Sequence, residues 1–122
     1  MIQVARHKPL PSVENGFKVI DQSFRTKEIN IKLIVIKGHY PKEGWLVCRG
    51  FQMYVTVQSG QVNYVCEKER KDNLVRNDDL LVEADTPHYF VAHQMTTLHV
   101  LSTAIWTPEN YKNVLTLEHA IA

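Results

Sequence analysis

The chain has 122 residues, of which 44% are hydrophobic and 22% are charged, and its formal net charge at pH 7 is +1. This length is enough for one hydrophobic core, and this composition is typical of a soluble globular protein and excludes a disordered or fibrous one. A net charge so close to zero argues against a basic stripe, so we expect neither nucleic acid nor a membrane as a partner.

The sequence also indicates the compartment. Residues 1–16 lack the apolar segment of a secretion signal, and no stretch of the chain approaches the ~20 apolar residues that a membrane helix needs. Two cysteines, Cys48 and Cys66, are too few to form the disulfide framework of a secreted domain of this size. We therefore expect a cytoplasmic protein with reduced thiols.

Before residue 105 the sequence alternates with the two-residue period of half-buried β-strands. The odd-numbered positions of 29–35 are all apolar, as are those of 51–57, and Ser59 and Gly60 then turn the chain into a further strand at 61–67. Other short strands are predicted at 17–22, 74–76, 80–83, 88–92 and 97–103, with a turn near His93 between the last two. Many short strands at even spacing predict a sandwich or a barrel.

Two segments stand out from this pattern. Residues 67–72 (EKERKD) interleave acidic and basic side chains, which indicates a solvated hairpin tip. In the C-terminal region Thr107 is a favourable N-cap, Pro108 occupies the first helical position, and Glu109 lies in the first turn. We therefore predict a short C-terminal helix, with Tyr111 docked against the barrel.

The segment from Asn77 to Leu101 (NDDLLVEADTPHYFVAHQMTTLHVL) combines a polar turn, a short apolar strand, a loop that ends in histidine, and a last apolar strand. It resembles the second conserved motif of the cupin superfamily, in which a Gly-Asp turn precedes a Pro-x-Gly-x-x-His loop. Asn77 and Asp85 replace the two glycines, and His88 matches the histidine. Asn and Asp are the residues other than glycine that most readily adopt a positive φ, so both turns are preserved.

The resemblance implies an all-β fold, namely a single small double-stranded β-helix of the jelly-roll type, as in small RmlC-like cupins. Residues 17–106 would form the barrel, residues 1–16 an N-terminal arm, and residues 107–122 a helical tail of the same domain. Cupins often pair through their β-strands, so the resemblance also implies a homodimer.

The first cupin motif, with a His-x-His pair, a Glu and a Gly, is altered. Gly60 matches the glycine, which places the Glu position at Met53. The two histidine positions fall on Val47 and Arg49 or, with a longer spacing, on Leu46 and Cys48. Of the four residues that hold a divalent metal ion in metal-binding cupins, only His88 is present here, and one donor does not hold a metal.

Two possibilities for a cofactor stay open. The metal site is incomplete and no metal binds, or other donors rebuild it with His88. The candidate donors are Cys48, Met53 and His39, a set that would favour zinc or copper(I) among the transition metals. Against this reading, buried Cys and Met are more often packing residues.

Polar side chains of the barrel could line a ligand pocket instead. We expect His88 to face the pocket, although it could simply orient its loop through backbone hydrogen bonds. Arg49 shares the parity of Phe51 and Met53, so it either clamps an anionic ligand, pairs with an internal carboxylate such as Glu43, or lies at the surface in another register. Tyr64 has the inward parity of Val62, and Tyr89 follows His88 directly. The candidate ligand-binding residues are Arg49, Met53, Tyr64, Tyr89 and His88.

These residues support three functional hypotheses, and whether the chain is an enzyme stays open. It binds a sugar, a sugar phosphate or a carboxylic acid in the barrel. Alternatively it is a metal-independent isomerase or epimerase, with His88 as the catalytic base and a tyrosine as the acid. The third hypothesis is a metal-dependent cupin enzyme with a site rebuilt from His88 and Cys48 or His39. A non-catalytic structural or assembly role is a further alternative, because one fold serves many functions.

Overall fold

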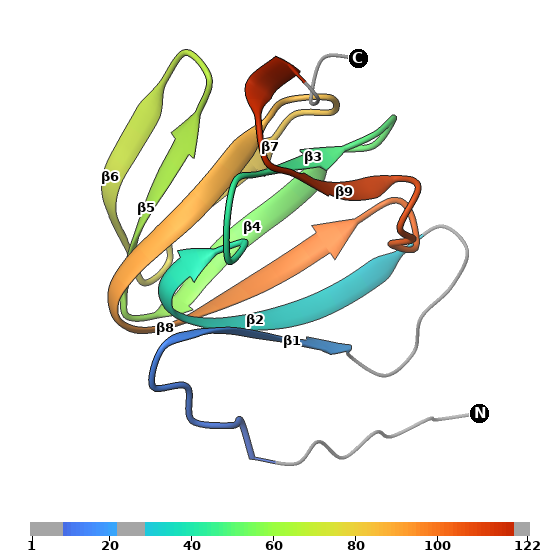
Figure 1. Ribbon diagram of the computed structural model, residues 1–122. Coiled ribbons are helices and arrows are strands. Elements are labelled where there is room, and N and C mark those ends of the chain that lie inside the picture. Colours follow the sequence, from blue (N-terminus) through green and yellow to red (C-terminus); the bar gives the residue numbers. More distant parts are fainter. Residues whose placement is uncertain (1–8, 22–28, 119–122) are drawn as a thin grey trace, which may run out of the picture.

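The computed structural model describes residues 9–21 and 29–118, which form a curled antiparallel sheet shaped as a half-barrel (Figure 1). The strands are β1 (Gly16–Asp21), β2 (Asn30–Tyr40), β3 (Trp45–Cys48), β4 (Met53–Ser59), β5 (Gln61–Cys66), β6 (Arg70–Val75), β7 (Asp79–Val82), β8 (His88–Ser102) and β9 (Tyr111–Val114). The all-β jelly-roll architecture expected from the sequence is confirmed. No helix in the described residues is long and apolar enough to span a membrane.

The longest strand, β8, connects the two sides of the half-barrel. One edge of β8 pairs with β2 and, at His88, with β3, while the other edge pairs with β5 and then with β4. The prediction of two strands with a turn near His93 is therefore wrong, because residues 88–102 form one continuous strand. Residues 93–95 are exposed where the β2–β8 register shifts, so this stretch is an irregular part of a strand and not a reversal of the chain.

The interior of the curled sheet is filled by alternate side chains of several strands. In β4 the buried positions are Met53, Val55 and Val57, as the two-residue period predicts. The rest of the core comes from β2, β3, β5, β7 and β8, and includes Ile34, Ile36, Leu46, Cys48, Val62, Val82, Phe90, Leu98 and Val100. This core holds the strand ends that carry the candidate site.

The prediction of a helix from Thr107 is wrong for residues 107–114. Thr107 does cap one turn, since its Oγ1 accepts a hydrogen bond from the Asn110 N–H at 3.2 Å. The chain then extends into β9, which pairs with β3. Tyr111 stacks on Trp106 with ring centroids 4.0 Å apart, and its hydroxyl hydrogen-bonds the Tyr40 hydroxyl at 2.6 Å. These contacts and the strand pairing outweigh one turn of helix, which is marginal by itself.

Parts of two predicted segments lie outside the described residues. These are residues 1–8 of the expected N-terminal arm and residues 119–122 of the expected tail. Gln22, at the end of the predicted first strand, also lies outside them, whereas residues 16–21 form β1 as the pattern indicates.

Gly60, in the turn between β4 and β5, offers a test of the packing. Its φ is +86°, and an added Cβ would lie 2.4 Å from Thr96 Oγ1 and 2.6 Å from the Met95 carbonyl oxygen. Gly50 has a similar φ of +77°, but an added Cβ would meet nothing within 4 Å. Gly50→Ala should therefore lower the free energy of unfolding by about 1 kcal/mol, from backbone strain alone. Gly60→Ala should cost about 1–3 kcal/mol more, because it also overpacks a close contact.

Urea denaturation of both variants and the parent protein measures the difference. Equal losses in the two variants would show that the close approach of β8 to this turn is absent.

Candidate functional site

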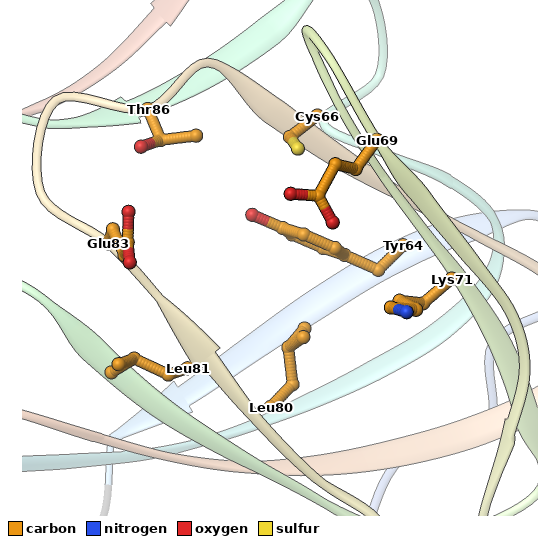
Figure 2. Close-up of a pocket in the computed structure, with 8 residues that line it drawn as sticks. All are labelled: Tyr64, Cys66, Glu69, Lys71, Leu80, Leu81, Glu83 and Thr86. Atoms are coloured by element: carbon orange, nitrogen blue, oxygen red, sulfur yellow. The ribbon is translucent and has the colours of Figure 1, made fainter.

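A pocket lies between the β5–β6 hairpin and the loop that connects β7 to β8 (Figure 2). Its volume is about 180 Å³. The lining residues are Tyr64, Cys66, Glu69, Lys71, Leu80, Leu81, Glu83 and Thr86. A second hollow of about 330 Å³ adjoins it, shares Cys66, Glu69, Glu83 and Thr86, and adds Glu67, Lys68, Asp85 and Pro87. We call the two adjoining hollows together the mouth of the pocket.

Tyr64 forms the inner wall of this pocket. Only 6% of its surface is exposed, and its hydroxyl points into the space between Glu69 of the hairpin and Glu83 of the loop (Figure 2). The hydroxyl makes no hydrogen bond with any residue in the described part of the chain. Burial, and then the neighbouring Cys66, Cys48, Glu83 and Glu69, raise the pKa of Tyr64. The phenol therefore stays protonated and offers a ligand both a donor and an acceptor.

His88 lies behind Tyr64 and is completely buried. The two rings are tilted against each other with centroids 5.7 Å apart. The His88 Nδ1–H donates to the Thr86 carbonyl oxygen at 2.9 Å, because a carbonyl can only accept. Nε2 then carries the lone pair, and it has no hydrogen-bond partner within the described residues. Burial lowers the pKa of His88 to about 4, only partly opposed by the hydrogen bond to Thr86, so the ring is neutral near pH 7.

The turn between β6 and β7 and the loop before His88 both adopt the backbone conformation expected from the sequence. Asn77 has φ +76° and Asp85 has φ +60°, the positive values that explain why these residues replace glycine. Asp85 also fixes the loop to the turn after β3: its N–H donates to the Cys48 carbonyl at 2.8 Å, and its Oδ1 accepts from the Gly50 N–H at 3.2 Å. The second motif thus positions one wall of the pocket.

Of the predicted ligand-binding residues only Tyr64 lines this pocket, because His88 is fully buried behind it and lines neither hollow. Met53 is fully buried in the core. Tyr89 lies on the opposite face of β8 from His88, where it stacks on His39 and meets the edge of Trp45. Arg49 is half-buried in the turn that follows β3, so the parity with Phe51 does not determine its direction. Of the predicted set, the structure brings together only Tyr64 and His88.

The predicted metal ligands are also separated. His39 pairs with Val91 and stacks on Tyr89, so it lies on the outer face of the sheet, whereas His88 lies on the inner face. Cys48 is on the inner face, and burial, together with Asp85, raises the pKa of its thiol to about 12. No group of three or more His, Cys, Asp or Glu side chains in the described residues could hold a metal ion. The described residues therefore do not fit the metal ion that the resemblance to metal-binding cupins implies.

Sequence reasoning missed most of the pocket. Glu69 and Lys71 belong to the charged segment that indicates a solvated hairpin tip, and both side chains are indeed exposed at its edge. Glu83 and Thr86 lie in the recognised loop, but they occupy motif positions without an assigned chemistry. The available signal was the chain order, since a hairpin after β4 and the loop before β8 meet at one end of a jelly roll.

Burial of neutral His88 predicts a pH dependence of stability. Its pKa is about 4 in the folded protein and about 6.5 when unfolded, so the unfolded state binds more protons between these values. The free energy of unfolding should therefore fall by about 3 kcal/mol from this group as the pH drops from 6.5 to 4. His88→Gln should reduce this loss, whereas His93→Gln, at an exposed position of β8, should not. Urea denaturation at several pH values measures this loss of free energy. Identical pH profiles of stability for the parent protein and His88→Gln would refute the conclusion that His88 causes it.

No family model matches the sequence, and no curated protein matches it. The fold of this protein is similar to that of several solved structures. Pac13, a nucleoside dehydratase from Streptomyces, superposes with a TM-score of 0.69 at 12% identity, over 85% of this chain and 82% of Pac13. An RmlC-like cupin from Desulfovibrio desulfuricans gives 0.63 at 16% identity, over 83% of this chain and 97% of that protein.

The cupin domain of Cnp3 from Schizosaccharomyces pombe gives a TM-score of 0.65 at 7% identity, over 84% of this chain and 74% of that domain. These identities are too low to transfer an activity, but the superpositions cover most of each chain. These superpositions show that the protein has a cupin fold.

Proposed function

We propose that the protein binds a small hydroxylated molecule, of the kind of a sugar or a nucleoside, in the pocket lined by Tyr64. The observation that carries this proposal is the Tyr64 hydroxyl, which points into the pocket and is unpaired within the described chain. A ligand hydroxyl can donate to it and accept from it. The carboxylates of Glu69 and Glu83 face the same space and would accept further hydrogen bonds from ligand hydroxyls.

The size of the pocket agrees with such a ligand. A volume of about 180 Å³ corresponds to the liquid volume of about six water molecules. This space suits a single sugar ring, and the adjoining hollow gives room for a second ring. Leu80 and the ring of Tyr64 supply the apolar surface against which the face of a sugar packs.

The structural relatives suggest which ligands to test first. Pac13 has been solved with bound uridine, and its fold is similar to that of this chain. This likeness supports uridine as a first probe, and glucose is a second probe of similar hydrogen-bonding character. Neither choice depends on a shared activity.

The binding proposal predicts opposite behaviour of two tyrosine variants. Tyr64→Phe should bind uridine or glucose about 3- to 10-fold more weakly, because it removes one hydrogen bond to the ligand. It should leave the stability of the free protein nearly unchanged, since the hydroxyl has no partner among the described residues. Tyr111→Phe should bind normally but unfold with about 1 kcal/mol less free energy, because the Tyr111 hydroxyl is bonded to Tyr40.

NMR titration measures affinity, and thermal unfolding measures both stability and ligand stabilisation, which should be about 2.7 kcal/mol at a hundredfold excess over Kd. Unchanged affinity in Tyr64→Phe would contradict the proposed site. Absence of binding of any sugar or nucleoside at millimolar concentration would contradict the function itself.

A second candidate function is metal-independent isomerisation or epimerisation, with His88 as the base and Tyr64 as the acid. The observation in its favour is the unprotonated His88 Nε2, which is buried and unpartnered in the described residues. Such an atom can take a proton from a carbon next to a carbonyl. The pKa of about 4 makes the ring a weak base in the free protein, so this candidate ranks second.

Hydrogen exchange in D₂O tests this second function. With a keto-sugar or a sugar nucleotide as substrate, the parent protein should replace one carbon-bound hydrogen by deuterium, and NMR of the substrate detects the loss of that signal. His88→Gln should abolish the exchange, while His93→Gln, on the outer face of β8, should retain it. Exchange at the parent rate in His88→Gln would eliminate His88 as the base.

A further inference from the structure

We infer that the pocket selects uncharged or cationic hydroxylated ligands and discriminates against their phosphorylated or carboxylated counterparts. This inference rests on the proposed binding function and names the class of ligand. It narrows the set of sugars, sugar phosphates and carboxylic acids that the sequence left open.

The first observation that supports this inference is the charge of the residues around the pocket. The residues that line the pocket and the adjoining hollow include four carboxylates and two ammonium groups, namely Glu67, Glu69, Glu83, Asp85, Lys68 and Lys71. The mouth is therefore negative, although the whole chain carries a net charge of +1. A negative concave surface lowers the local concentration of anions and raises that of cations.

The arrangement of these charges is the second support. Glu69 on the hairpin and Glu83 on the loop lie on opposite sides of the Tyr64 hydroxyl (Figure 2). An anionic group bonded to this hydroxyl would lie between two carboxylates. Lys71 lies on the hairpin side only, so it offsets one of the two repulsions at most.

The nearby cations are the third support. Sites for phosphate or carboxylate typically use the planar fork of arginine. No arginine in the described part of the chain lines the two hollows. Arg70, on the same hairpin, is engaged with Asp72, with Nη2 2.8 Å from Oδ1. Neither Glu69 nor Glu83 forms an ion pair with another described residue, so no described cation lies within ion-pair distance of either carboxylate.

The size of the effect is moderate, because both glutamates are exposed and salt screens them. The lining of the pocket itself, with Glu69 and Glu83 against Lys71, has one excess negative charge. A dianionic phosphate near it should bind about tenfold more weakly than the uncharged parent compound at low ionic strength. The difference should shrink as salt is added.

Matched ligand pairs test the inference by NMR titration at low ionic strength. Uridine should bind about tenfold more tightly than uridine 5′-monophosphate, and glucose more tightly than glucose 6-phosphate. Glucosamine, whose amine is protonated, should bind at least as tightly as glucose. Equal or tighter binding of the phosphorylated members would overturn this inference and leave the proposed function standing. If no member of the panel binds, the proposed function fails and this inference fails with it.

The double variant Glu69→Gln and Glu83→Gln identifies the source of the selection. The measured quantity is the affinity for the phosphorylated ligand divided by the affinity for the uncharged ligand. The double variant should raise this ratio by about tenfold, even if both affinities change. Glu109→Gln, in the turn before β9 and outside both hollows, is the matched control and should leave the ratio unchanged. Lys71→Met should move the ratio in the opposite direction. An unchanged ratio in the double variant would overturn the inference.

Discussion

The antiparallel pairing of β8 with four other strands is the constraint on which the rest of the structure depends. A strand has two edges, so four partners require β2 and β3 to share one edge and β4 and β5 to share the other. Twist accumulates along a strand of fifteen residues, so β8 and the strands paired with it curl. The curvature encloses the core and brings the β5–β6 hairpin opposite the loop before His88. The pocket is the remaining gap between these two elements.

The parts of this structure that depend on local backbone chemistry could be predicted from the sequence. Asn77 and Asp85 were expected to adopt positive φ, and they do so for the reason given, since their short polar side chains tolerate that region. The alternation in 51–57 predicted the inward face of β4 correctly. Alternation in 29–35 showed only that a strand is present, because Ile34 and Ile36 on the other face are buried as well as Val35. In β2 both faces are apolar.

The rest depends on contacts between segments distant in the sequence, which local patterns do not contain. Thr107 signals a helix start correctly for one turn, but the pairing of β9 with β3, which is far away in the sequence, determines the conformation of residues 111–114. The alternation of inward and outward side chains does not predict the direction of Arg49, because β3 ends at Cys48. For the candidate site, the sequence identified Tyr64 and His88 on the barrel wall, whereas Glu69 and Lys71 join them only because the hairpin folds against the loop.

The unpaired polar atoms of Tyr64 and His88 have a consequence for affinity. Removing a polar atom from water without giving it a partner costs about 1–3 kcal/mol, and for His88 Nε2 this cost is already included in the stability of the free protein. The Tyr64 hydroxyl differs, because it faces the pocket and stays accessible to water until a ligand binds. Both side chains are also held in place, one by Thr86 and one by the packed core, so little rotamer entropy is lost. The site is preorganised, with part of the cost of recognition incurred during folding.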